Sequence, residues 1–424
     1  MLFFLLWGCG EPNVNISYDY ERDSQPSEIT DTSPAGETAS ETQELTFYRD
    51  IRPVLDRTCN QCHWEAGRSF QMLDPTLVIA WAPVIHRDIE DGGKPPPTPD
   101  PECASYLGDY WHITEDDISL IQQWIDQDCP VGDEADAPTY ADWSSIGPFD
   151  QELDPEFNIT TTEGYRCFVF TPQEGKAITD MQFFTSDEEL IHHSLVYLTD
   201  EDFTPPQMNP QGAFACSYSG QEDWRLIAGW RPGAPPLPLA EEQGIPVQPG
   251  QKLILQMYYT PPVGEPAPGQ DTNPMYKWGI KYTDEVSKPL YSKRISNFNF
   301  MIPADATNHI ENAQFTWDGG KSQLVGILPR THLYGIGIEA ELHKSNNETQ
   351  CLFNVTGYDF GMPHMLLFSD VIEVDNGDII KYNCSWNNSE ENDRQMRFPP
   401  ADVFTGYGPE EAVCYLDFLV LPLE

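Results

Sequence analysis

The chain has 424 residues, of which 39% are hydrophobic and 12% aromatic, enough to build several domains with cores of their own. Its 23 Lys and Arg are outnumbered by 68 Asp and Glu, giving a net charge of −45, which excludes nucleic acid and anionic membrane surfaces as partners. Most of the ten cysteines are spread singly along the chain, a pattern that indicates disulfides in an oxidising compartment.

The N-terminus predicts export. Residues 1–9 form a short apolar run that ends at Leu6-Trp7-Gly8-Cys9 and resembles a bacterial lipoprotein signal cut before Cys9. Residues 10–44 are rich in Ser, Thr, Glu, Asp and Pro, which predicts a disordered acidic tether. We therefore expect a periplasmic or cell-surface protein attached to a bacterial membrane only through a lipid on Cys9.

One short motif carries redox chemistry. Cys59-Asn60-Gln61-Cys62-His63 has the spacing that covalent attachment of a c-type haem requires, because two thiols one turn apart bond to the vinyl groups and the adjacent imidazole binds iron. The alternatives are a redox CxxC and half of a zinc site, and the zinc site would need a second ligand pair close downstream, which is missing. The motif predicts haem c on Cys59, Cys62 and His63.

Residues 45–134 predict a small all-α domain around that motif. Asp50 is a candidate N-cap for a first helix that ends at Cys59. A second helix is predicted to begin at a capping box formed by Thr114 and Asp117. Cys103 and Cys129 flank this second helix, so a disulfide between them is one possible pairing.

The segments FYRDIRPVLDRTCNQCH, DGGKPPPTP, CASY and WIDQDCPVGD occur in an order that resembles a small cytochrome c domain fused to other bacterial oxidoreductases. In that family the second iron ligand is usually the methionine of a Met-Pro-Pro segment, and the matching residue here is Lys94. A deprotonated lysine amine can bind ferric iron, whereas a thioether favours ferrous iron. Met72 is the other candidate ligand, and a five-coordinate haem is the third alternative.

Beyond residue 135, short runs of β-branched and aromatic residues alternate with turns rich in Pro, Gly and Asn. Such runs are too many for one small sandwich, so we expect two antiparallel β-sandwich domains, at 146–290 and 291–424. The predicted strands lie at 165–171, 190–198, 252–260, 276–282, 335–342, 378–386 and 413–421.

The same half contains YRCFVF, IHHSLVYL, GWRPGAPP, ILQMYY, PRTHLYG, GYDF and GYGPEEAVC in this order. Together they resemble the copper type II, ascorbate-dependent monooxygenases, which include the peptidylglycine α-hydroxylating and dopamine β monooxygenases. The resemblance spans roughly residues 146–424. It implies two jelly-roll-like domains with one copper each, electron storage at the first and C–H hydroxylation of a small organic substrate at the second. It also implies the disulfides Cys384–Cys414 and Cys167–Cys216.

Only half of that family's copper ligands have a counterpart in this chain. His192 and His193 match the pair at the first copper, and Tyr258 replaces the third histidine. At the second copper only His332 matches, because neither a guanidinium nor a valine side chain can donate to a metal. Arg330 and Val413 stand at these two lost positions. The other donors from which a site could be rebuilt are His309, His343, His364, Met362 and Met365.

Two functions of different classes therefore stay open. The first is an exported oxidoreductase in which haem c passes electrons to a copper monooxygenase module. The second is a non-catalytic descendant that acts as a haem electron-transfer protein or a surface binding and scaffold protein, with a redox partner in place of a substrate. A third alternative is a five-coordinate haem that binds a small ligand or peroxide.

Overall fold

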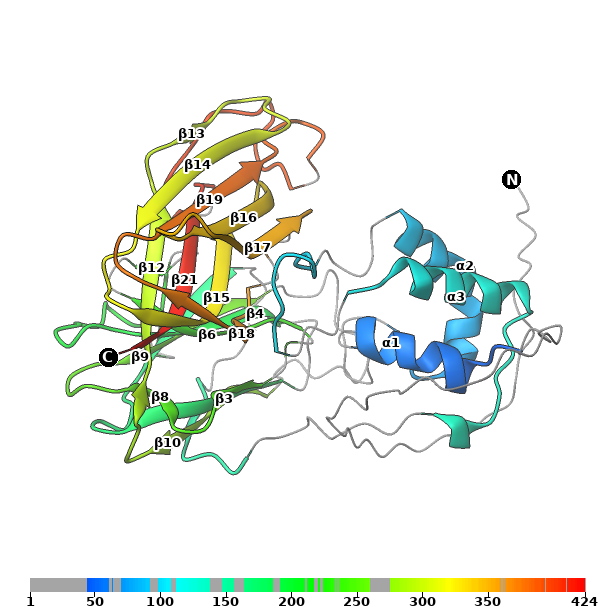
Figure 1. Cartoon of the computed structure of the whole chain (residues 1–424), viewed down its shortest axis with the longest axis horizontal. Helices are drawn as coiled ribbons and strands as arrows, with labels where there is room; N and C mark the ends of the chain where they lie inside the picture. The colour runs from blue at the N-terminus through cyan, green and yellow to red at the C-terminus, as the bar shows by residue number, and fades with distance from the viewer. Residues whose placement is uncertain are drawn as a thin grey trace. The chain divides into compact units, whose positions relative to one another are not determined.

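The structure is a computed structural model and falls into two compact units (Figure 1). The helical unit comprises Met1–Pro95 and Tyr110–Ser145, and the β unit comprises Pro96–Asp109 and Ile146–Glu424. The residues described are 44–60, 63, 70–91, 98–107, 112–137, 147–155, 164–185, 191–209, 212–216, 220–221, 224–232, 234, 236–259, 275–358, 360, 363–392, 394–408 and 410–423.

The helical unit packs short helices around a single core. Its elements are the π-helical turn η1 (Phe47–Ile51), α1 (Arg52–Thr58), α2 (Pro75–Glu90), α3 (Glu115–Asp126) and the 3-10 turn η2 (Glu134–Asp136). Phe47 and Trp124 are completely buried at its centre. Within the described ranges no helix is long and apolar enough to cross a membrane.

The N-termini of the helices agree with the predicted caps in one case and differ in another. Thr114 and Asp117 form the predicted capping box at the start of α3. Asp50 is not an N-cap, because the chain is already in the π-helical turn there and α1 follows without a break. The Asp50 carboxylate instead accepts a hydrogen bond from the backbone N–H of Thr46 at 2.7 Å. Helix α2 was not predicted, although Asp74 caps it by accepting from Thr76 N.

The first half of the β unit contains two sheets. One runs in the order β1 (Gln151–Leu153), β10 (Tyr276–Thr283), β3 (Ala177–Thr185), β8 (Gln243–Pro246) and β11 (Lys288–Pro289), with β7 (Leu237–Pro238) also paired to β3. The other runs β5 (Ala213–Phe214), β2 (Gly164–Phe170), β9 (Leu253–Tyr259), β4 (Ile191–Leu198) and β6 (Arg225–Trp230).

The second half repeats this plan. One sheet runs β12 (Tyr291–Asn297), β21 (Cys414–Pro422), β15 (Ser322–Thr331) and β18 (Leu366–Val374), and the other runs β14 (His309–Thr316), β19 (Ile379–Trp386), β16 (Gly335–His343) and β17 (Thr349–Thr356). A short ribbon pairs β13 (Met301–Ile302) with β20 (Val403–Phe404). The predicted antiparallel β-sandwich architecture is confirmed, and all seven predicted strands are present.

The two halves of the β unit share a core. One hydrophobic cluster joins residues of the first half, such as Leu195, to Leu328 and Leu419 of the second half. At Gly229 on β6 an added Cβ would lie 2.8 Å from the carbonyl oxygen of Pro363, so the backbones of the two halves touch there. The halves are therefore packed as one body.

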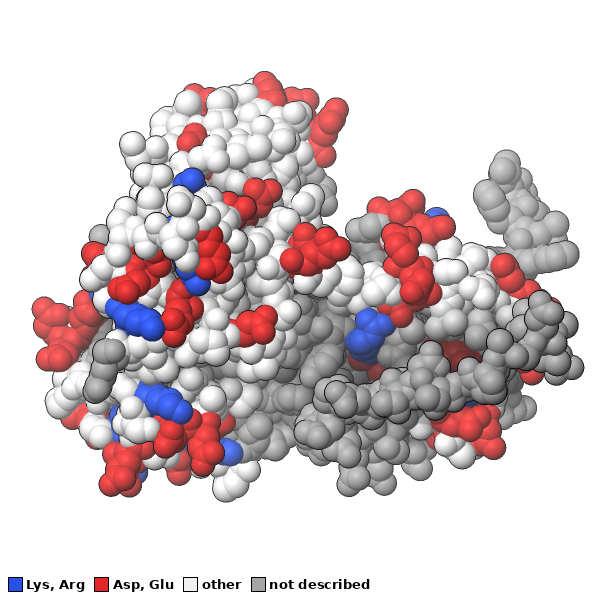
Figure 2. Space-filling view, in the orientation of Figure 1, with Lys and Arg blue, Asp and Glu red and all other residues white. Residues whose placement is uncertain are grey.

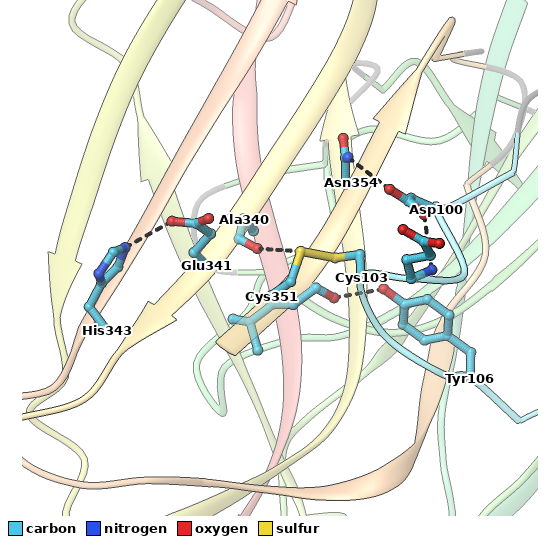
Figure 3. The surroundings of a disulfide bond; sticks show 10 residues. Asp100, Cys103, Tyr106, Ala340, Glu341, His343, Cys351 and Asn354 are labelled. Atoms are coloured by element: carbon cyan, nitrogen blue, oxygen red, sulfur yellow. Dashed lines mark hydrogen bonds and ion pairs between the residues drawn. A yellow bond between two sulfur atoms is a disulfide. The ribbon is translucent and has the colours of Figure 1, made fainter. Parts of the chain in front are cut away.

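Three disulfides are described, and all lie in the β unit. Cys167–Cys216 and Cys384–Cys414 are formed as the resemblance implied. The suggested pair of Cys103 with Cys129 is wrong, because Cys103 is bonded to Cys351 on β17 (Figure 3). The reason is that residues 98–107 leave the helical unit and run along the β unit. Cys129 is disulfide-bonded as well.

Candidate functional site

The motif predicted to bind haem begins at the end of α1. The helix carries Cys59 to the edge of the core, where this residue is 9% exposed and its Sγ lies 3.3 Å from Thr58 Oγ1. His63 follows one turn later and donates its backbone N–H to the Cys59 carbonyl at 3.0 Å. Cys62 and Lys94, like the lipidation candidate Cys9, lie outside the described residues.

The imidazole of His63 has a defined orientation. Its Nδ1 lies 2.9 Å from the backbone oxygen of Phe70. Because a carbonyl oxygen only accepts, Nδ1 must carry the hydrogen of this contact, and in a neutral ring this fixes the Nδ1–H tautomer. A histidine held in this tautomer is suited to bind a metal through Nε2.

Met72 is hydrogen-bonded to this histidine through the backbone. Its backbone N–H donates to the His63 carbonyl at 2.8 Å, and its side chain is 5% exposed within the helical core. His63 would bind one face of the iron. Because Met72 is hydrogen-bonded to His63 through its backbone, it is a poor candidate for the ligand on the opposite face. Its buried side chain has a packing role in any case.

A buried ion pair supports the motif, and sequence reasoning missed it. Arg52 Nε donates to Asp56 Oδ1 at 2.6 Å, and Asn60 Nδ2 donates to the same oxygen at 2.6 Å. All three residues are at most 9% exposed. Their spacing of four residues on a helix was the available signal. The network fixes Asn60, which lies inside the haem motif.

The two histidines of the first candidate copper site converge because of a β-bulge. Successive side chains on a regular strand point to opposite faces, but the register of β4 against β9 shifts between Ile191 and His193. An irregularity of this kind re-aims a side chain. As a result His192 Nδ1 and His193 Nδ1 lie 2.9 Å apart.

Tyr258 lies next to this pair, as the alignment of strands requires. It is the register partner of His193 on β9, and its ring centroid lies 5.4 Å from that of His193 and 5.1 Å from that of His192. Phe360, from the second half of the β unit, stacks on His192 at 5.2 Å. The three predicted residues of the site are thus together, covered by an aromatic side chain.

The second candidate copper site has no comparable donor set. His332 Nδ1 lies 2.7 Å from the Glu411 backbone oxygen. Desolvation by burial, together with the charge of Arg330, lowers the pKa of His332 to about 4. Arg330 and Val413 are both completely buried. In the described part of the chain no group of three or more His, Cys, Asp or Glu could hold a metal ion.

The other candidate copper ligands each contact a different residue. His309 contacts Glu311 at 2.9 Å, and His343 contacts Glu341 at 2.9 Å. His364 Nδ1 accepts from Arg231 Nε at 3.2 Å. Met365 is 6% exposed and belongs to the shared core, while Met362 lies outside the described residues. These residues do not assemble a new site in the described structure.

A second buried ion pair lies in the β unit and was also missed. Arg294 on β12 donates to both carboxylate oxygens of Asp417 on β21, at 2.8 and 3.0 Å, and lies over the ring of Tyr415 at 4.2 Å. Desolvation, the main cause, raises the pKa of the Tyr415 hydroxyl, although the nearby arginines oppose this shift. The Tyr415 phenol therefore stays protonated, and the Arg294–Asp417 ion pair has a structural role.

Away from these buried pairs the surface is acidic. Figure 2 shows Asp and Glu side chains dispersed over the visible face, with the fewer Lys and Arg among them. Several of the cations are engaged in exposed ion pairs, such as Lys277 with Glu152 at 2.8 Å. Among the described residues on this face, Lys and Arg form no cluster suited to nucleic acid.

Comparison with known proteins identifies no relative. No family model and no curated protein matches the chain. Solved structures with weak likeness include the infectious bursal disease virus Gx strain (9% identity, 64% of this chain and 70% of that chain, TM-score 0.18). Others are proteins predicted to be secreted from Eubacterium rectale (9%, 64% and 74%, TM-score 0.19) and Parabacteroides distasonis (9%, 65% and 78%, TM-score 0.17). At these scores the likenesses carry no argument.

Proposed function

We propose that the protein is an exported c-type haem protein that transfers electrons, with a β unit that serves as a binding scaffold. The observation that carries this proposal is the contact between His63 Nδ1 and the Phe70 carbonyl, which orients the imidazole that the motif predicts as the iron ligand. Such a carbonyl partner fixes the tautomer and raises the basicity of a ligating imidazole. The disulfides of the β unit support an oxidising compartment, and a lipid on Cys9 would hold the protein at a membrane.

Two of the residues that would hold a covalent haem, Cys59 and His63, are described in the structure. Cys59 supplies a thiol at the end of α1, and the Arg52–Asp56–Asn60 network holds the turn that follows. When bound, the haem would supply reversible one-electron transfer. The chain's own residues would attach it through Cys59 and Cys62, and the Phe70 carbonyl would orient His63.

The haem proposal is tested by the spectrum of the purified full-length protein. We expect a reduced-minus-oxidised difference spectrum with a c-type band, which persists in denaturant because the haem is covalent. His63→Ala should lose the iron–imidazole ligation, while His112→Ala, a histidine of the same unit outside the motif, should leave the spectrum unchanged. A parent protein without a c-type band would remove the proposal.

A copper monooxygenase is the second candidate, and the paired Nδ1 atoms of His192 and His193 favour it. With metal–nitrogen bonds of about 2.0–2.1 Å, two ligands at right angles lie about 2.9 Å apart, which matches the observed separation. Tyr258 would add a third donor if ionised. We place this candidate second because Arg330 and Val413 replace the other donors at His332, so oxygen activation lacks its copper.

Metal analysis separates the two candidates. We expect at most one copper per haem, lost in His193→Ala and retained in His309→Ala, whose imidazole pairs with Glu311. Two coppers per haem in the parent protein would reverse the order of the candidates. Copper binding that survives His193→Ala would show that the ion is held elsewhere.

A further inference from the structure

A short segment between two helices of the helical unit belongs to the β unit. Residues 98–107, here called the strap, lie between α2 and α3 in sequence but belong to the β unit. The strap begins at an Asx-type turn, in which Asp100 Oδ1 accepts the Glu102 backbone N–H at 2.9 Å. It then passes through Cys103 to the buried Tyr106.

The strap closes the open side of the second sandwich. Strands β17 and β18 each lie at one edge of its two sheets, and edge strands present unpaired backbone groups. Asp100 N donates to Asn354 O on β17 at 2.8 Å, and Leu107 N donates to Leu367 O on β18 at 2.7 Å. Ser369 N donates back to Ser105 O at 3.0 Å. One segment thus bonds to both edges.

Tyr106 inserts the strap into the core. Its ring packs against Phe368 at 5.4 Å, and its hydroxyl donates to the Leu352 backbone oxygen at 2.6 Å (Figure 3). The residue is 5% exposed and belongs to the hydrophobic cluster of the second sandwich. The strap is therefore packed into the β unit and is not an exposed surface loop.

The disulfide of the strap is half-buried at both of its cysteines. Cys103 and Cys351 are both half-buried and line an open pocket of about 210 Å³ together with Ser105, Gln350 and Asp370. By contrast, both cysteines of Cys384–Cys414 are completely buried, and in Cys167–Cys216 one cysteine is completely buried and the other half-buried. Accessible disulfides react with thiols before buried ones, because the attacking thiolate must approach along the S–S axis.

We propose that the strap is a redox-sensitive clasp, opened by an exported dithiol protein that reduces Cys103–Cys351. One thiolate of the reductant attacks a sulfur of this bond and forms a mixed disulfide, and its second thiolate then displaces the remaining cysteine. Two electrons and two protons pass to Cys103 and Cys351, and the reductant becomes a disulfide. The pocket beside the bond gives the attacking thiolate its approach.

Opening the clasp would release the strap from the second sandwich. The hydrogen bonds from Asp100 N to Asn354 O on β17 and from Leu107 N to Leu367 O on β18 would then no longer be supported by the covalent link to Cys351. Dithiol reduction would thus expose backbone groups at the edges of β17 and β18.

The order of disulfide reduction tests the clasp without any reference to haem. The full-length protein is treated with increasing dithiothreitol under native conditions, quenched by alkylation and analysed by mass spectrometry. We expect Cys103 and Cys351 to be alkylated first, while Cys167, Cys216, Cys384 and Cys414 stay bonded. Simultaneous reduction of all three disulfides, or earlier reduction of Cys167–Cys216, would overturn the proposal.

Hydrogen exchange then tests release. In Cys103→Ser/Cys351→Ser, or in the mildly reduced parent if that variant fails to fold, the amides of Asp100, Leu107 and Ser369 should exchange faster by on the order of a hundredfold, the factor that the constraint of one disulfide corresponds to. Tyr106→Phe, which keeps the disulfide and loses only one hydrogen bond, should show a much smaller increase. Unchanged exchange in the reduced protein would show that the strap stays bound without its disulfide.

Discussion

Single residues decide the chemistry that the β unit can support. At the second candidate copper site the completely buried Arg330 places a fixed positive charge where a copper ion would need donors, which opposes metal binding. The same charge, with desolvation as the larger cause, keeps His332 neutral. A neutral imidazole that donates to the Glu411 carbonyl is a satisfied structural residue of this fold.

The neutral state of His332 predicts a pH dependence of stability. Its pKa is lowered from 6.5 to about 4 in the folded protein, so between these values the unfolded chain binds a proton that the folded chain does not. The free energy of unfolding is therefore highest above pH 6.5 and falls as the pH drops toward 4, by roughly 3 kcal/mol at most. The measurement is urea unfolding at a series of pH values.

His332→Asn is the control for this titration. The Asn amide can still donate to the Glu411 carbonyl but takes up no proton. We expect the variant to lose less stability than the parent between pH 6.5 and 4. An identical loss in both proteins would show that other groups carry the acid sensitivity.

At the scale of elements, the irregular features matter most. The bulge in β4 brings His192 and His193 to one side, and the strap supplies an extra layer between β17 and β18. The helical unit shows the opposite case, in which a local sequence signal determines the element. The capping box of α3 was predictable from Thr114 and Asp117, because both of its hydrogen bonds join residues three apart.

This capping box gives a prediction for the helical unit. Thr114 Oγ1 accepts the Asp117 N–H at 3.1 Å, and Asp117 Oδ2 accepts the Thr114 N–H at 2.8 Å. Thr114→Ala should lower the free energy of unfolding of this unit by about 1 kcal/mol, while Thr114→Ser should be close to neutral. Chemical denaturation followed by circular dichroism measures both, and equal destabilisation by Ala and Ser would contradict the capping role.

At the scale of the whole molecule, the β unit should behave as one cooperative body. Residues from both halves form a single cluster, and β21 is buried at every position from Cys414 to Leu421 because other strands flank it and both faces are covered. A fully buried strand of this type does not alternate in polarity. The predicted division at residue 290 therefore separates two sets of strands within one packed unit.

Gly229→Ala tests this cooperativity. The added methyl would meet the Pro363 carbonyl at 2.8 Å, Leu195 at 2.9 Å and Leu328 at 3.0 Å, so overpacking should cost about 1–3 kcal/mol. Hydrogen exchange should rise by the same factor in peptides from both halves. Val371→Ala, at a side chain that is 69% exposed, should have no effect. A response confined to one half would show two independently folding domains.

The sequence by itself determined the features whose causes are local or periodic. Strands such as Ile191–Leu198 and the Thr114 cap were predicted, because periodicity and capping act over short stretches. The two disulfides within the sandwiches were predicted from the order of motifs that carries the resemblance. Helix α2 was missed even though Asp74-Pro75 is a local start signal. The haem on Cys59, Cys62 and His63 stays a prediction from motif spacing.

Only the tertiary structure decided the rest, because those features join residues far apart in the chain. The Cys103–Cys351 bond spans 248 residues, so its partner depends on the path of the strap and not on cysteine spacing. The convergence of His192 and His193 depends on how β4 registers against β9. Burial of Arg330 likewise follows from the packing of one half on the other. Long-range packing sets each of these, and no short stretch of sequence records it.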